Sequence, residues 1–86
     1  MPEISRFYGI IIKMYYDDHP PAHFHAYYGD FEVVVNIETL GVLAGNLPPR
    51  AMGLVTEWGT YRQEELRAAW ENARQLQKIG KIEPLS

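Results

Sequence analysis

The spacing of apolar residues changes at Pro48-Pro49, and this change is the strongest constraint on the fold. Before it, short runs rich in Ile, Val, Tyr and Phe alternate with turn residues, which is typical of β-strands. After it, apolar residues recur every three or four positions, which is typical of an amphipathic helix. Proline suits the first turn of a helix, where its missing N–H group has no partner to lose. The chain is therefore predicted to be an α+β protein with a sheet half and a helical half.

A single domain accounts for the chain of 86 residues, with a sheet half at 1–47, a helical half at 48–80 and a tail at 81–86. The sequence holds no cysteine, so neither disulfide bonds nor thiolate metal ligands contribute to its stability. A small domain of this kind must rely on its apolar core, and 47% of the residues are hydrophobic. No apolar run approaches the ~18 residues of a membrane span and no signal-peptide pattern is present, which predicts a cytoplasmic protein.

Charge is distributed unevenly between the two halves. The formal net charge of −3 argues against a protein that coats nucleic acid or anionic membrane. Residues 1–49 carry two basic and six acidic side chains, whereas residues 50–86 carry six basic and five acidic ones. The acidic sheet half therefore favours a cation or a basic partner over a phosphate backbone.

The sheet half is predicted to form an antiparallel meander of three to four strands. The strands are expected at 7–17, 23–28, 31–37 and 42–44. Gly29-Asp30 has the composition of a two-residue hairpin turn, and such a turn sets the register of the strands on either side. With that register Phe24 lies opposite Val35 on an apolar face. His25 lies on the other face, because successive side chains of a strand alternate.

The face that carries His25 is predicted to be rich in polar and aromatic side chains. Its members are Lys13, Tyr15, Asp17, His23, His25, Tyr27, Glu32 and Asn36. The helical region is expected to cover the opposite, apolar face. The residues predicted beneath it are Phe24, Ala26, Phe31, Val33 and Val35. The polar face is then open to water or to a partner.

One long helix or two shorter helices fit the helical half. The apolar stripe consists of Ala51, Leu54, Val55, Trp58, Tyr61 or Arg62, Leu66, Ala69, Ala73 and Leu76. Gly59 weakens a helix interior by about 1 kcal/mol, and the segment 60–63 resembles a capping box, so a break is expected there. The helical region is predicted to end at Gly80, and Ile82 and Leu85 in the tail are expected to dock on the sheet.

All three histidines of the chain, His19, His23 and His25, fall within seven residues. His23 and His25 share a strand face with backbones about 7 Å apart, so their rings can close onto one metal ion or one anionic group. His19 supplies a third ring, and Asp17 or Asp18 supplies a carboxylate ligand. The alternative is structural, with the same rings capping the proline-rich turn and bonding to the backbone or to Asp17.

A catalytic interpretation uses the same two histidines without a metal. His23 or His25 acts as general base and the other as general acid, which suits metal-independent RNA cleavage. Tyr27 and Lys13 are nearby donors. Tyr15 and Tyr27 can stack on the bases of single-stranded nucleic acid, although cross-strand packing explains these tyrosines as well. The candidate binding residues are Lys13, Tyr15 and Asp18.

A combination of motifs runs along the chain. It comprises residues 1–12, the segment 14–26 with its His23-Phe24-His25 motif, Leu47-Pro48, the spacing of Trp58 and Trp70, and the ending 82–85. Together these stretches resemble the small bacterial domain-of-unknown-function family 4160, over essentially the whole chain. The histidine and proline motif is the most specific part of the resemblance. Its residues in this chain are Asp17, Asp18, His19, Pro21, His23 and His25.

The resemblance implies a role in a toxin-antitoxin-like pair, with a small cognate protein as partner. The leading interpretation is a cytoplasmic member of such a pair whose histidine-bearing face binds a partner or nucleic acid, with catalysis left open. The alternatives are a metal-binding module that uses the three histidines with Asp17, and a non-enzymatic interaction domain. An open edge of the sheet allows pairing with another chain, whether a second copy or a partner.

Overall fold

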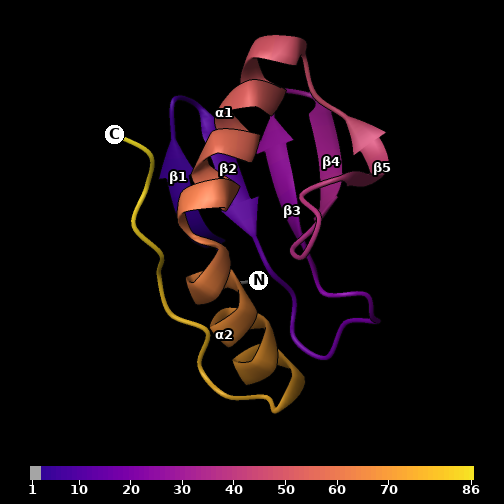
Figure 1. Cartoon of the computed structure of the whole chain (residues 1–86), viewed down its shortest axis with the longest axis vertical. Helices are drawn as coiled ribbons and strands as arrows, with labels where there is room; N and C mark the ends of the chain where they lie inside the picture. The colour runs from indigo at the N-terminus through magenta and orange to yellow at the C-terminus, as the bar shows by residue number, and fades with distance from the viewer. Residues whose placement is uncertain (1–2) are drawn as a thin grey trace.

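The computed structural model describes residues 3–86 and shows five antiparallel strands followed by two helices (Figure 1). The elements are β1 (Glu3–Phe7), β2 (Ile10–Lys13), β3 (His23–Tyr28), β4 (Phe31–Asn36), β5 (Val42–Asn46), α1 (Pro49–Tyr61) and α2 (Gln63–Arg74). The sheet order β1-β2-β3-β4-β5 follows the chain. The α+β class and the antiparallel meander are confirmed, whereas the predicted number of three to four strands is wrong. Met1 and Pro2 of the predicted sheet half lie outside the described residues.

The additional strand arises from a tight turn at Tyr8-Gly9. Both residues have positive φ, 50° for Tyr8 and 80° for Gly9, and Phe7 pairs directly with Ile10 across the turn. This is the backbone of a type I′ hairpin, which suits glycine but is uncommon for tyrosine. The single strand predicted at 7–17 is therefore wrong, because the turn divides it and β2 ends at Lys13.

The predicted register of the β3–β4 hairpin is confirmed. Every pair expected across the Gly29-Asp30 turn is observed, from Tyr28 with Phe31 to His23 with Asn36. The core face of the hairpin is fully buried and consists of Phe24, Ala26, Val33 and Val35. Phe31 departs from the prediction, with 46% of its surface exposed, because it follows the turn directly at the end of the sheet.

Helix α1 lies across one face of the sheet, and α2 continues past the end of the strands (Figure 1). Trp58 of α1 is fully buried, with its ring centroid 5.4 Å from that of Phe7 and 5.6 Å from that of Phe24. This tryptophan therefore joins the helix to two strands of the sheet. Neither helix combines the length and the apolar character that crossing a membrane requires.

The two helices are separated at Arg62, whose φ of −114° departs from helical geometry. The break expected within 59–63 is confirmed at Arg62, whereas Gly59 itself is a buried residue of α1. A Cβ atom at Gly59 would come within 2.9 Å of the Leu40 side chain, so glycine permits this close approach. The predicted capping box is wrong. No side chain caps α2, and the Thr60 hydroxyl donates to the carbonyl oxygen of Thr56.

The predicted apolar stripe includes residues at the C-terminal ends of α1 and α2 that are not buried. Helix α2 ends at Arg74 rather than near Gly80. Leu76 lies beyond that end with a φ of 58° and 69% of its surface exposed. Tyr61, at the last position of α1, is also exposed. These two side chains therefore lie outside the core.

The C-terminal tail docks on the sheet, as predicted. Ile82 is buried, and its N–H group donates to the carbonyl oxygen of Ile4 in β1 at 2.7 Å. The indole Nε1 of Trp58 donates to the carbonyl oxygen of Glu83 at 2.8 Å. Leu85 is partly buried against the core. The tail thus runs along β1 and is tied to both layers (Figure 1).

Gly45→Ala is expected to destabilise the protein by at least about 2 kcal/mol. Gly45 has a φ of 74°, and an added Cβ atom would overlap the backbone carbonyl of Glu32. Gly53→Ala is the matched control, because Gly53 is exposed in α1 with open space around it. The control is expected to stabilise the protein by about 0.5–1 kcal/mol. Urea denaturation measures both effects, and two small, equal effects would contradict this backbone geometry.

Candidate metal centre

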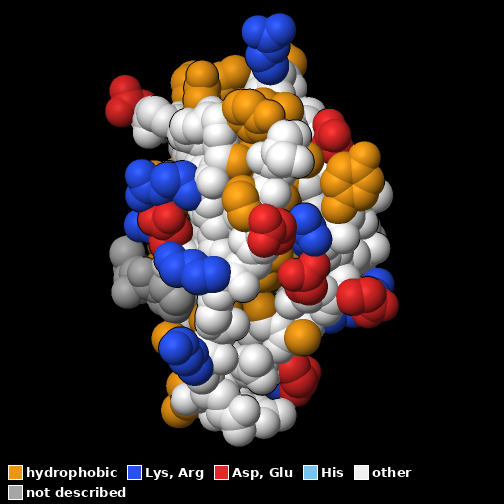
Figure 2. Space-filling view, turned by 90° about the vertical axis from the view of Figure 1, so that its left-hand side faces the viewer, with side chains coloured by type: hydrophobic (Ala, Val, Ile, Leu, Met, Phe, Trp, Pro, Cys, Tyr) orange, Lys and Arg blue, Asp and Glu red, His pale blue; other side chains and the backbone are white. Residues whose placement is uncertain are grey.

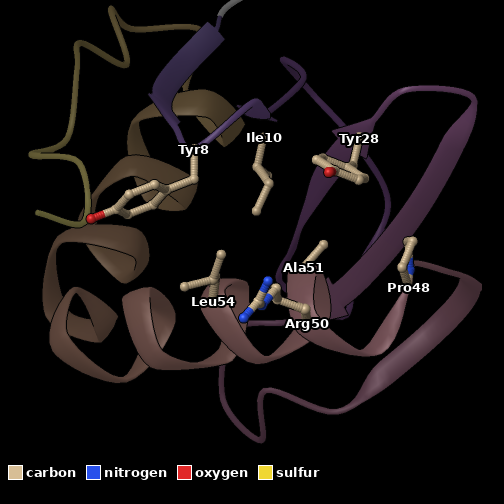
Figure 3. A pocket seen from close by; sticks show the side chains of 7 residues that line it. All are labelled: Tyr8, Ile10, Tyr28, Pro48, Arg50, Ala51 and Leu54. Carbon is tan, nitrogen blue, oxygen red and sulfur yellow. The ribbon is translucent and has the colours of Figure 1, made fainter.

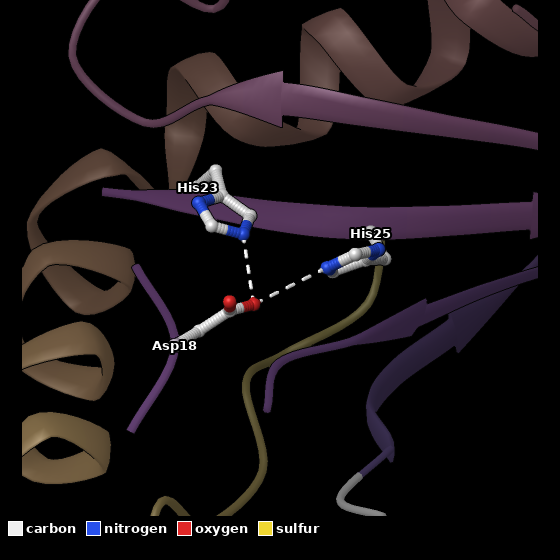
Figure 4. Close-up of side chains that lie close together, drawn as sticks. All are labelled: Asp18, His23 and His25. Atoms are coloured by element: carbon white, nitrogen blue, oxygen red, sulfur yellow. Dashed lines mark hydrogen bonds and ion pairs between the residues drawn. The ribbon is translucent and has the colours of Figure 1, made fainter. Parts of the chain in front are cut away.

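Three side chains meet beside the beginning of β3. His23 and His25 are the first and third residues of that strand, and Asp18 lies in the loop that joins β2 to β3. Figure 4 shows both imidazole rings turned toward the Asp18 carboxylate. Asp18 Oδ2 lies 2.9 Å from His23 Nε2 and 3.6 Å from His25 Nε2. One carboxylate oxygen therefore faces a ring nitrogen of each histidine.

The backbone of the loop holds Asp18 in this position. Asp17 has a φ of 53°, and its N–H group donates to the carbonyl oxygen of Ala73 near the end of α2 at 3.2 Å. The other carboxylate oxygen of Asp18 accepts the N–H group of His19 at 2.8 Å. Asp17 and His19 are exposed, whereas Asp18 is partly buried. The turn at Asp17 thus directs Asp18 alone toward the histidines of β3.

Each histidine is oriented through its second ring nitrogen. His23 Nδ1 lies 2.7 Å from the carbonyl oxygen of Pro21, and His25 Nδ1 lies 3.1 Å from Glu32 Oε2. Both of these neighbours are acceptors, so the Nδ1 atoms carry the hydrogens and donate. Buried His25 Nε2 has no hydrogen-bond partner among residues 3–86. The arrangement presents the Nε2 atoms of both rings to Asp18.

The histidines are more enclosed than the sequence predicts. His23 is only 9% exposed, because α2 extends past the sheet and Trp70 packs against the imidazole with ring centroids 5.0 Å apart. The prediction that His23 lies on an open face is therefore wrong. His25 has 16% of its side chain exposed, and Tyr15 packs edge-to-face on its ring at 4.6 Å.

Two tyrosines border the group on the same sheet face. The Tyr15 and Tyr27 hydroxyl oxygens are 2.6 Å apart, and Lys13 Nζ lies 5.2 Å from the centre of the Tyr27 ring. Burial, the Tyr15 hydroxyl and the Glu32 carboxylate raise the pKa of Tyr27 well above its ordinary value. Tyr27 is therefore a neutral hydrogen-bonding group at physiological pH.

The Asp18 carboxylate is stabilised in its charged form. Burial by itself raises the pKa of Asp18, but the hydrogen bonds from His19 and His23 and the neighbouring His25 outweigh that effect. The pKa of Asp18 therefore lies below its ordinary value. A negative charge is thus maintained at the point where the two Nε2 atoms converge.

Asp18→Asn is expected to destabilise the metal-free protein by about 1 kcal/mol at pH 5, the typical net contribution of a hydrogen bond. Because the folded-state pKa of Asp18 is lowered, its contribution is present above the unfolded pKa and is lost as pH falls through the folded pKa. The difference between the variant and the wild type should therefore shrink from pH 5 to pH 2.5. Urea denaturation in EDTA across this range measures it, with exposed Asp17→Asn as control. A difference that is constant with pH would contradict the role of the Asp18 charge.

The structure brings together some of the predicted site residues and separates others. Asp18, His23 and His25 form the group whose ligand atoms all lie within 4.8 Å of one another. His19 and Asp17, predicted as metal ligands, are exposed and do not belong to that group. Glu32 orients the His25 ring through its contact with Nδ1. The sequence predicts Glu32 on the polar face but not this contact. The pairing of its strand with β3 is the sequence signal that could have indicated it.

The two separations from Asp18 Oδ2 are compatible with donors that share one metal ion. Two donors at about 2.1 Å from a metal lie about 3.0 Å apart at an octahedral angle and about 3.4 Å apart at a tetrahedral angle. The observed 2.9 Å and 3.6 Å separations from Asp18 Oδ2 bracket these values. Two imidazole nitrogens and one carboxylate oxygen are ligands that Zn²⁺, Fe²⁺ and related ions accept.

Comparison with known proteins adds the family. The model of the family described as Domain of unknown function (DUF4160) matches residues 9–71. The chain belongs to this family. The match includes Asp18, His23 and His25 together with α1 and most of α2. No curated protein and no solved structure matches the chain.

Proposed function

We propose that this DUF4160 domain is a metal-binding module that holds one divalent transition-metal ion through Asp18, His23 and His25. The observation that carries the proposal is the orientation of the two imidazoles. Each donates from Nδ1 to an acceptor and presents Nε2 to the same carboxylate oxygen. Metal-bound histidines commonly have this second hydrogen bond, which fixes the tautomer and the ring orientation.

A cation accounts for the polar contacts of this group. Without a metal, His23 lies between two acceptors, the Pro21 carbonyl and the Asp18 carboxylate, so both nitrogens donate only when the ring carries both protons. His25 Nε2 is left without a hydrogen-bond partner in the described chain. A metal ion supplies one electron-pair acceptor for both Nε2 atoms and for the carboxylate.

The donor set determines the class of ion and the coordination that remains. Ca²⁺ and Mg²⁺ bind mainly oxygen ligands, so a site with two imidazoles favours transition metals. Three protein ligands are fewer than the four of a closed structural zinc site. At least one position therefore remains for water or for an incoming ligand. The geometry supports a reactive or ligand-binding metal centre more than a purely structural one.

Metal-independent RNA cleavage, the competing use of the same histidines, receives less support. His23 is covered by Trp70, which limits its access to a substrate hydroxyl. Asp18 and Glu32 contact the two histidines and would repel a phosphate. The two carboxylates favour a bound cation at this position.

Thermal denaturation of the tag-free protein tests the proposal. A metal that binds only the native state must stabilise it, and a concentration one hundredfold above Kd should raise the thermal midpoint by about 15 °C. Zn²⁺ and Mn²⁺ are the probes and Mg²⁺ is the control metal. No shift with either transition metal, or an equal shift with Mg²⁺, would overturn the proposal.

Glu32→Gln is expected to weaken Zn²⁺ binding by about tenfold to one hundredfold, although Glu32 is not a ligand. The amide provides a weaker acceptor for His25 Nδ1 and so reduces the basicity of Nε2. Isothermal titration calorimetry measures the affinity. Glu38→Gln is the matched control, because Glu38 pairs with Arg67 away from the metal centre. Equal losses in the two variants would indicate a general effect of charge instead.

A further inference from the structure

A pocket lies at the other end of the sheet from the metal centre. Strand β3 begins at His23 in that centre and ends at Tyr28, which lines the pocket. The volume of the pocket is about 340 Å³, and its walls are mainly apolar. Its lining residues are Tyr8, Ile10, Tyr28, Pro48, Arg50, Ala51 and Leu54 (Figure 3). The pocket therefore lies between two hairpin turns and the beginning of α1.

Two tyrosines that line the pocket on its sheet side are exposed to solvent. Tyr8 is 61% exposed and Tyr28 is 39% exposed. Figure 3 shows both tyrosines on one side of the pocket, with Leu54 and Arg50 on the other. Tyr8 also has a φ of 50°, a conformation that is uncommon for a bulky residue and that concentrates at functional sites. In Figure 2, hydrophobic side chains gather at the end of the molecule where α1 begins.

Arg50 gives the pocket a positive charge. Arg6, Arg62, Arg67 and Arg74 each pair with a glutamate. Arg50 forms no ion pair within residues 3–86. The first turn of α1 contains no acidic residue, and no side chain caps its N–H groups. The partial positive charge of the helix end therefore adds to that of Arg50.

We propose that this pocket binds a small aromatic carboxylate. Apolar and phenolic walls suit a planar ring, and Arg50 with the first turn of α1 suits an anionic group attached to that ring. The volume is at the lower end of the range for ligand pockets, which suits a single ring system. The site is independent of the metal centre and of the function proposed for it.

Phenylacetate, phenethylamine and acetate are the probes, because they separate the contribution of the ring from that of the charge. Each is titrated into the full chain at low salt while backbone amides are followed by NMR. EDTA is present throughout, so that a metal ion cannot bind the carboxylates. Phenylacetate should shift the amides of Tyr8, Tyr28 and Ala51 saturably and bind about tenfold more tightly than phenethylamine. Acetate should not saturate these shifts.

Arg50→Gln is expected to reduce the affinity for phenylacetate to that for phenethylamine. Arg74→Gln removes an exposed arginine at the end of α2 and should leave the affinity unchanged. Equal binding of the two aromatic probes to the wild type, shifts confined to residues outside the pocket, or no saturation by phenylacetate would overturn the proposal. An unchanged affinity in Arg50→Gln would also overturn it.

Discussion

Replacing His25 by alanine is expected to lower the affinity of the protein for Zn²⁺ by at least about one hundredfold, more than the loss of an outer-shell contact. The substitution removes one of the three ligand atoms that converge within 4.8 Å. Isothermal titration calorimetry on tag-free protein, with a competing chelator where binding is tight, measures the change. The loss should appear in the affinity while the metal-free variant still unfolds cooperatively.

His19→Ala is the matched control for that experiment. His19 belongs to the same sequence cluster but is exposed and lies outside the convergent group. Its removal is expected to change the Zn²⁺ affinity by less than about threefold, because no ligand atom is lost. If His19→Ala weakens binding as much as His25→Ala, the metal is held by the loop in a different arrangement.

Trp58→Ala is expected to have the largest effect on stability, a loss of about 3–5 kcal/mol. The side chain is fully buried, packs on Phe7 and Phe24 and donates to the carbonyl oxygen of Glu83. A small domain has a total stability of about 5–15 kcal/mol, so the variant should be close to unfolding at room temperature. Urea denaturation followed by the fluorescence of Trp70 measures the loss.

Two further variants separate the contribution of Trp58 packing from that of its hydrogen bond and from a general effect of removing an aromatic side chain from α1. Trp58→Phe keeps a ring in the core and loses the hydrogen bond to Glu83, so its expected loss is smaller, about 1–3 kcal/mol. Tyr61→Ala removes an exposed aromatic side chain from the same helix and should change stability by less than about 0.5 kcal/mol. A loss below about 1 kcal/mol for Trp58→Ala would contradict the packing of α1 on the sheet.

Local signals explain which parts of the sheet are predictable from the sequence. The β3–β4 hairpin follows from Gly29-Asp30 and strict alternation, so its register is correct at every pair. The turn at Tyr8-Gly9 escapes detection because tyrosine rarely adopts a positive φ, and only the tertiary fold requires it here. Because this turn was missed, the sequence predicts one strand where the structure has both β1 and β2.

The position of Asp18 shows where alternation ceases to be informative. Continuing the strand to residue 17 predicts Asp17 on the face of the histidines. The strand ends at Lys13, and the positive φ of Asp17 reverses the chain so that the next carboxylate points inward. Strand parity predicts faces only while the residues remain in the strand.

The environment of His23 depends on contacts between distant segments. Trp70 of α2 covers the His23 ring, and the N–H group of Asp17 bonds to Ala73 of the same helix. Neither contact follows from local spacing, because both depend on how far α2 extends past the sheet. The sequence therefore predicts that the histidines share a face but not that one of them is buried.

Histidine side-chain ¹⁵N NMR during a Zn²⁺ titration tests the metal centre most directly, because it reports on each ring nitrogen. Saturation is predicted at one equivalent, with large shifts at the Nε2 atoms of His23 and His25. Their Nδ1 atoms should stay protonated, since they donate to Pro21 and Glu32. The signals of His19 should remain unchanged. Unchanged Nε2 signals of His23 and His25, or shifts that involve His19 equally, would contradict a metal centre formed by Asp18, His23 and His25.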